Sequence, residues 1–111
     1  MTQPNGLVKG TLDMMVLRIL SRGEAHGWGI TEKLAEFSSR KILVEEGTLY
    51  PALYRMQDKG WLKSEWKVTD KGQRAKFYTL TPAGRKQLAE EKESWARAVS
   101  LIAQVMEAEL P

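Results

Sequence analysis

The side chains that most often carry acid–base, nucleophilic or metal chemistry are few in this sequence, and their spacing does not combine them. There is one histidine, His26, and no cysteine, so disulfides and thiolate chemistry are excluded. A metal site at His26 would need partners at ligand spacing, which the sequence does not supply. The nearest candidates for paired carboxylates are Glu90, Glu91 and Glu93, which are interspersed with basic residues as on a solvated helix face. We therefore expect no enzyme activity, no cofactor and no metal.

The chemistry that remains is electrostatic, because the excess positive charge is concentrated in one segment. The whole chain has a formal net charge of +3 at pH 7. Residues 55–76 hold seven basic and three acidic side chains, whereas residues 1–54 are balanced and residues 77–111 have one acidic side chain in excess. A clustered basic segment is typical of nucleic-acid binding. Charge alone leaves a solvated, lysine-rich surface as an equal alternative.

Helical periodicity accounts for the first part of the chain. One helix is predicted from Lys9 to Arg22 and a second from Gly29 to Ser39. Their apolar stripes are Leu12, Met15, Val16, Ile19 and Leu20 in the first helix, and Ile30, Leu34 and Phe37 in the second. A connecting segment from Arg40 to Glu46 follows, anchored by Ile42 and Val44.

The segment before the second helix contains the lone histidine and two glycines around a tryptophan. We expect His26 to be a capping or loop residue and Trp28 to lie in the core. Gly27 and Gly29 are not part of a phosphate-binding loop, since neither a preceding strand nor the required lysine is present. They are expected to allow a tight turn into the helix.

A third helix is predicted from about Gly47 to Lys59, with Pro51 near its start and a Schellman stop at Gly60 and Trp61. Alternating residues in segments 62–68 and 74–80, with a turn between them, predict a half-buried β-hairpin. Thr81 and Pro82 are expected to start a last helix, from Ala83 to about Glu109.

These elements predict a mainly α fold with a small β-hairpin (α+β), in the order α-α-α-β-β-α. This order is that of a winged helix-turn-helix. We expect residues 1–81 to form this domain and residues 82–111 to form a dimerisation helix. No apolar run is long enough to cross a membrane, and the segment from Met1 to Gly6 lacks the apolar core of a signal peptide, so a cytoplasmic protein is expected.

Several stretches resemble those of a known family. They are residues 12–17 (LDMMVL), 26–30 (HGWGI), 46–56 (EGTLYPALYRM), 60–62 (GWL) and 76–84 (KFYTLTPAG). Together they resemble the PadR family of transcriptional regulators, and the stretch from Gly47 to Leu53 is the most specific of them. The resemblance implies a cytoplasmic, dimeric repressor that binds double-stranded DNA and that a small molecule releases in some members. With one C-terminal helix, the chain resembles the short form of the family, which implies dimerisation through the last and first helices.

The third helix is the candidate recognition helix, because the N-terminal residues of this element meet base edges in helix-turn-helix proteins. Its candidate DNA-binding residues are Thr48, Tyr50, Pro51, Tyr54 and Arg55. Arg55 is suited to pair with guanine, and the tyrosine hydroxyls are suited to phosphates or bases. For Tyr50, packing of the ring against the first helix is an equal alternative.

The turn of the hairpin is the candidate wing, since arginine and lysine are favoured beside the phosphates and in the minor groove. The candidate residues of the wing and of the flank of the third helix are Arg40, Lys41, Lys71, Gln73, Arg74 and Lys76. The alternative for the wing is a solvated turn. A winged-helix module that binds another protein instead of DNA is the alternative function, and the basic wing argues against it.

The last helix carries an apolar stripe that is too long for a three-helix core to cover. Its candidate dimer-interface residues are Leu88, Trp95, Val99, Ile102 and Met106. Trp95 is also a candidate contact for a flat aromatic effector held across a two-fold axis, which the family resemblance allows. Its more ordinary role is that of a residue in the dimer core.

Overall fold

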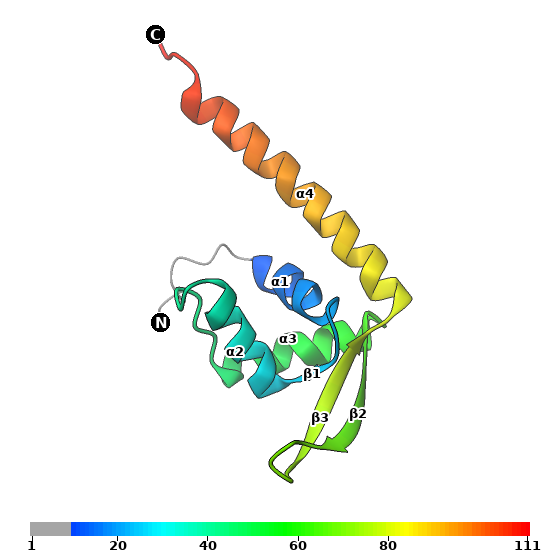
Figure 1. Cartoon of the computed structure of the whole chain (residues 1–111). Coiled ribbons are helices and arrows are strands. Elements are labelled where there is room, and N and C mark those ends of the chain that lie inside the picture. The colour runs from blue at the N-terminus through cyan, green and yellow to red at the C-terminus, as the bar shows by residue number, and fades with distance from the viewer. Residues whose placement is uncertain (1–9) are drawn as a thin grey trace.

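A computed structural model describes residues 10–111 of the chain (Figure 1). The expected helix start at Lys9 and the segment from Met1 to Gly6 lie outside the described residues. The elements, in chain order, are α1 (Thr11–Leu20), β1 (Ala25–His26), α2 (Gly27–Phe37), α3 (Glu46–Asp58), β2 (Leu62–Val68), β3 (Arg74–Leu80) and α4 (Pro82–Glu107). The predicted winged helix-turn-helix is confirmed, with one additional short strand.

The first three helices pack around one core because each has an apolar stripe at helical spacing. The fully or almost fully buried side chains of this core are Val16, Leu17, Leu20, Ile30, Leu34, Leu49, Leu53 and Met56. Val44 is buried and Ile42 packs against the core, so the predicted anchoring of the segment between α2 and α3 is confirmed. The core holds one face of α3 against α1 and α2 and leaves the opposite face of α3 exposed to solvent.

Two aromatic residues that were expected in the core lie on the surface. Trp28 is 57% exposed, because it falls in the first turn of α2, about 200° around the helix from the buried Ile30. Phe37 is 72% exposed, because it is the last residue of α2. There the chain turns away through Ser39 and Arg40, whose φ angles are positive at 55° and 63°. Both predictions were therefore wrong.

The sheet has three antiparallel strands in the order β1-β3-β2, and β1 was not predicted. One face of the hairpin runs from the core into solvent. Along this face β2 and β3 pair as Leu62 with Leu80, Ser64 with Tyr78, Trp66 with Lys76 and Val68 with Arg74. The first two pairs are mostly buried, but Trp66 is 57% exposed and Val68 is also exposed. The predicted half-buried strand is therefore correct only for its inner half.

The junction between α3 and α4 is built from backbone contacts. A Schellman turn ends α3 as predicted: the Trp61 N–H donates to the Met56 carbonyl at 3.0 Å, and Gly60 has a φ of +82°. The Thr81 hydroxyl accepts the Gly84 N–H at 3.0 Å and donates to the Gly60 carbonyl at 2.7 Å. A side chain at Gly84 would collide with the Trp61 carbonyl, so the first turn of α4 lies directly on the backbone of that residue.

Most of α4 extends away from the rest of the molecule (Figure 1). Only Gly84 and Leu88 of this 26-residue helix are buried. The radius of gyration is 16.0 Å, compared with about 13 Å for a compact domain of 100 residues. Leu88, a candidate dimer-interface residue, lies in the core of the single chain at 8% exposure, and so leaves little surface for a partner. No helix in the described part of the chain meets the length and hydropathy needed to cross a membrane.

Candidate nucleic-acid interface

The outward face of α3 carries the candidate recognition residues. Leu49, Leu53 and Met56 hold the opposite face in the core. Thr48, Pro51, Tyr54 and Arg55 are exposed, and Tyr50 is half-buried. With the helix starting at Glu46, Pro51 lies in the second turn rather than the first, so it fails to supply an N–H for the Gly47 carbonyl and costs one helical hydrogen bond.

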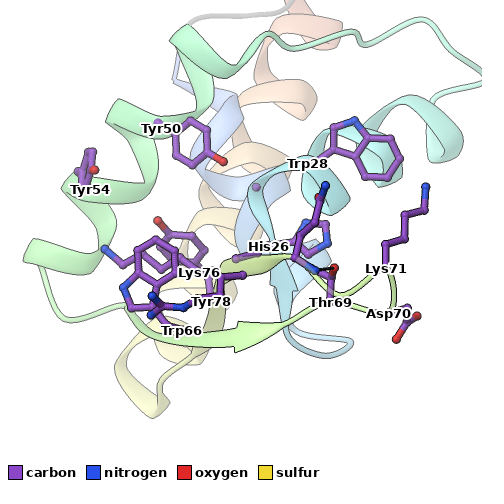
Figure 2. Close-up of a pocket in the computed structure, with 14 residues that line it drawn as sticks. His26, Trp28, Tyr50, Tyr54, Trp66, Thr69, Asp70, Lys71, Lys76 and Tyr78 are labelled. Carbon is purple, nitrogen blue, oxygen red and sulfur yellow. Dashed lines mark hydrogen bonds between the residues drawn. The ribbon is translucent and has the colours of Figure 1, made fainter.

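Tyr50 lies between α3 and the start of α2. A side chain at Gly27 would collide with the Tyr50 hydroxyl and ring, so this glycine makes room for the tyrosine. Burial raises the pKa of Tyr50, and the nearby Glu46 and Tyr54 raise it further. The phenol therefore stays protonated at neutral pH and keeps its O–H as a donor. The ring packs against α2 and the hydroxyl faces the space in front of the wing (Figure 2).

His26 positions the start of α2, as predicted. It is the N-cap of the helix, and its Nδ1 accepts the Gly29 N–H at 3.0 Å. Its ring also packs edge-on against Phe77 of β3, with the ring centroids 5.1 Å apart. The cap orients the first turn of α2 so that Trp28 faces the hairpin turn (Figure 2).

Arg55 is held by an ion pair within the chain. Its Nη2 lies 2.5 Å from Oδ1 of Asp13, which is on α1. Half of the arginine side chain is still exposed, whereas Asp13 is largely covered. A guanidinium has five N–H donors, so this single contact leaves donors for a base edge. The sequence did not reveal this pair, because the two residues are 42 positions apart.

The wing is a tight turn with cations on β3, the strand that follows it. The Gly72 N–H donates to the Thr69 carbonyl at 2.9 Å, and Gly72 has a φ of +81°. The Arg74 guanidinium lies 5.1 Å from the centre of the Trp66 ring. The Lys76 ammonium lies 5.5 Å from the ring of Tyr54, and this contact joins the wing to α3.

Between α3, the start of α2 and the wing lies a cleft of about 810 Å³ (Figure 2). Its lining includes the predicted residues Tyr50, Tyr54, Lys71, Gln73, Arg74 and Lys76. It also includes the aromatic residues His26, Trp28, Trp66 and Tyr78, and its one acidic residue is Asp70. The cleft therefore combines aromatic rings with an excess of positive charge.

The remaining predicted residues lie elsewhere. Thr48, Pro51 and Arg55 are on α3 but do not line the cleft. Arg40 and Lys41 are exposed in the turn after α2 and are also outside it. Sequence reasoning missed Trp28 and Trp66 as surface residues. A signal for Trp66 was available, since Lys67 follows it in the strand and Lys76 pairs with it in the facing strand.

Comparison with known proteins agrees with this architecture. Residues 16–90 match the PadR-like family of transcriptional regulators. The chain belongs to this family. A transcriptional regulator of Mycobacterium tuberculosis is 36% identical over 84 residues, which cover 76% of this chain and 75% of that protein. The resemblance noted in the sequence is thereby confirmed.

Solved structures of PadR regulators share the fold along most of the chain. A PadR-like regulator from Bacillus cereus has a TM-score of 0.77 at 32% identity, covering 91% of this chain and 96% of its own. A PadR family regulator from Eggerthella lenta has a TM-score of 0.80 at 32% identity, covering 91% and 86%. The chain is accordingly a transcriptional regulator of the PadR-like family, built as a winged helix.

Proposed function

We propose that this PadR regulator is a homodimeric repressor that binds an inverted-repeat operator in the cytoplasm. One observation carries the proposal: the exposed face of α3 and the basic wing border the same cleft, so both elements can meet one duplex. Lys71, Arg74 and Lys76 supply cations for phosphates. Thr48, Tyr54 and Arg55 stand on the exposed side of α3, and this side would enter the major groove in the proposed complex. We assign no chemical reaction to the protein.

The dimer is proposed to form through α4. Beyond Leu88, this helix exposes large apolar side chains, namely Trp95, Val99, Leu101, Ile102, Val105 and Met106. Trp95, Val99, Ile102 and Met106 follow a spacing of four, three and four residues, and so share one face of the helix. An exposed apolar stripe of this length is rare on a soluble monomer, and a second copy of α4 would cover it. In this division, residues 82–111 serve assembly and residues 1–81 bind DNA.

A small flat aromatic effector is proposed to act at the same dimer face. Trp95 is half exposed at the middle of the stripe, so two copies across a two-fold axis would offer two facing rings. Tryptophan fluorescence with a planar aromatic compound tests this, with Trp95→Phe as the control that removes the response.

The salt dependence of duplex binding tests the main proposal. Because several cations per subunit would release counterions, we expect a log–log slope of roughly −4 to −8 per dimer. Lys71→Ala and Arg74→Ala should each make the slope shallower by about one unit per subunit. Lys92→Ala, on the exposed part of α4, is the matched control and should leave the slope unchanged. Fragments selected from the source genome supply the duplex, and a slope near zero would contradict DNA binding.

A further inference from the structure

Two large, exposed indole rings line the cleft from different elements of the fold. Trp28 comes from the first turn of α2 and Trp66 from the middle of β2, and each is 57% exposed. By contrast, Trp61 is partly buried and packs against the core. On the outer part of the sheet face, Trp66 pairs with Lys76 and lies under the Arg74 guanidinium, and its apolar neighbour Val68 is itself exposed. Exposed indoles at such positions contribute little to the core, and two of them in one cleft with Tyr54 form an apolar surface of the kind that marks a binding site.

The charge of the cleft indicates an anionic occupant. Lys71, Arg74 and Lys76 line it, against the single carboxylate of Asp70. Trp66 pairs with Lys76 on the hairpin, and Figure 2 shows Lys71 on the hairpin turn and Trp28 on α2, so that both rings and cations line the cleft. A nucleic-acid backbone is complementary to both, because each anionic phosphate is followed by a deoxyribose whose carbon atoms form an apolar surface. A small anion would match the cations but would leave most of the lining uncovered.

We propose that Trp28 and Trp66 are DNA-contacting residues, and that the cleft holds one backbone strand of the duplex between them. In this arrangement the three cations pair with phosphates, while the indole rings pack against deoxyribose groups. The inference rests on the proposed function and deepens it, since it assigns an apolar part of the affinity to residues outside the recognition helix. Apolar contacts release no counterions, so their share of the affinity does not depend on salt.

Salt titrations of single variants separate this apolar contribution from the electrostatic one. Trp28→Ala and Trp66→Ala should each weaken duplex binding about tenfold at every salt concentration, with an unchanged log–log slope. Lys76→Ala should make the slope shallower. Phe37→Ala is the matched control, because Phe37 is an exposed aromatic residue outside the cleft, and its affinity should equal that of the wild type.

Fluorescence supplies a second readout with conservative variants that keep an aromatic ring. Duplex should change the tryptophan emission of the wild type, and Trp28→Phe and Trp66→Phe should each reduce the size of that change. If the duplex-induced change in emission is as large in these variants as in the wild type, the proposed contact is wrong, whatever affinity the variants have for the duplex.

The outcomes distinguish the inference from the function on which it rests. If the wild type binds duplex and both alanine variants bind it equally tightly, the inference is wrong and the proposed function stands. If Trp66→Ala instead makes the slope shallower, the ring serves only to hold Arg74, which also overturns it. If the wild type binds no duplex under any salt condition, both the proposed function and the inference fail.

Discussion

At the scale of single residues, Gly27 shows how a missing side chain shapes the proposed DNA-binding surface. Gly27→Ala should destabilise the fold by about 1–3 kcal/mol, because the new methyl group collides with the Tyr50 ring. Combining it with Tyr50→Ala should recover part of that loss, since the obstacle is gone. Chemical denaturation of the two single variants and the double variant measures this coupling. Strictly additive losses would show that the two residues do not compete for space.

Arg55 offers a test of base recognition against a purely structural ion pair. If Arg55 reads a base, Arg55→Ala should lower the preference for operator over unrelated duplex by about 1–3 kcal/mol. Asp13→Ala removes the partner on α1 but leaves the guanidinium, so it should keep most of that preference. Competition binding with operator and unrelated duplex measures both. Equal loss of preference in the two variants would assign Arg55 to positioning α3.

The residues and contacts that the sequence did not reveal depend on where each helix lies against the rest of the fold. Periodicity identifies the face of a helix that is apolar, but not where the core ends along it, and so Phe37 was placed inside. Trp28 was expected in the core, although its angle from Ile30 places it on the outer face of α2. The partner of Arg55 was out of reach, since a contact across 42 positions depends on the packing of α1 on α3.

At the scale of elements, the helices and the hairpin were predicted because their patterns extend over many residues. The last helix is an example: Thr81 and Pro82 marked its start, and it ends within two residues of the expected position. β1 was missed, because two residues paired with Tyr78 and Phe77 show no periodicity of their own. The cleft also depends on how elements meet, which no single segment reveals.

The cap of α4 can be tested at this scale. Thr81→Ala should lower the free energy of unfolding by about 1 kcal/mol, because the Gly84 N–H and the Gly60 carbonyl both lose a partner. Thr81→Ser keeps the hydroxyl and should recover most of the loss. Thermal and denaturant unfolding of the two variants gives the comparison, and identical stability of the alanine and serine variants would show that the hydroxyl is not needed.

At the scale of the whole molecule, the exposed stripe of α4 determines the proposed assembly. Val99→Glu combined with Ile102→Glu should yield a monomer, since two carboxylates would be buried without partners in the dimer interface. Gln104→Glu adds charge on the opposite side of the helix and should leave the dimer intact. Analytical ultracentrifugation measures both. A monomeric wild type at micromolar concentration would contradict the arrangement.

Loss of the dimer should carry over to DNA binding. Two recognition helices about 34 Å apart can enter successive major grooves on one side of a duplex, so the full operator should bind far more tightly than a half-site. The doubly substituted variant should bind the full operator and a half-site with similar, weak affinity. Gel-shift titration with both duplexes measures the ratio, and a ratio that survives loss of the dimer would show that each subunit binds independently.

The close approach of Gly84 to the Trp61 carbonyl sets the direction in which α4 leaves the winged-helix body. The first turn of α4 lies against the backbone of residue 61 and the Leu80 side chain, so the corner between α4 and the winged-helix body is closely packed. In the proposed dimer, the point and angle at which the two α4 helices cross would therefore set the distance between the two recognition helices. Moving the crossing by one helical turn shifts it by about 5.4 Å. Substitutions confined to the exposed stripe of α4 would thus change the preferred spacing between operator half-sites and leave the proposed DNA-binding surface unaltered.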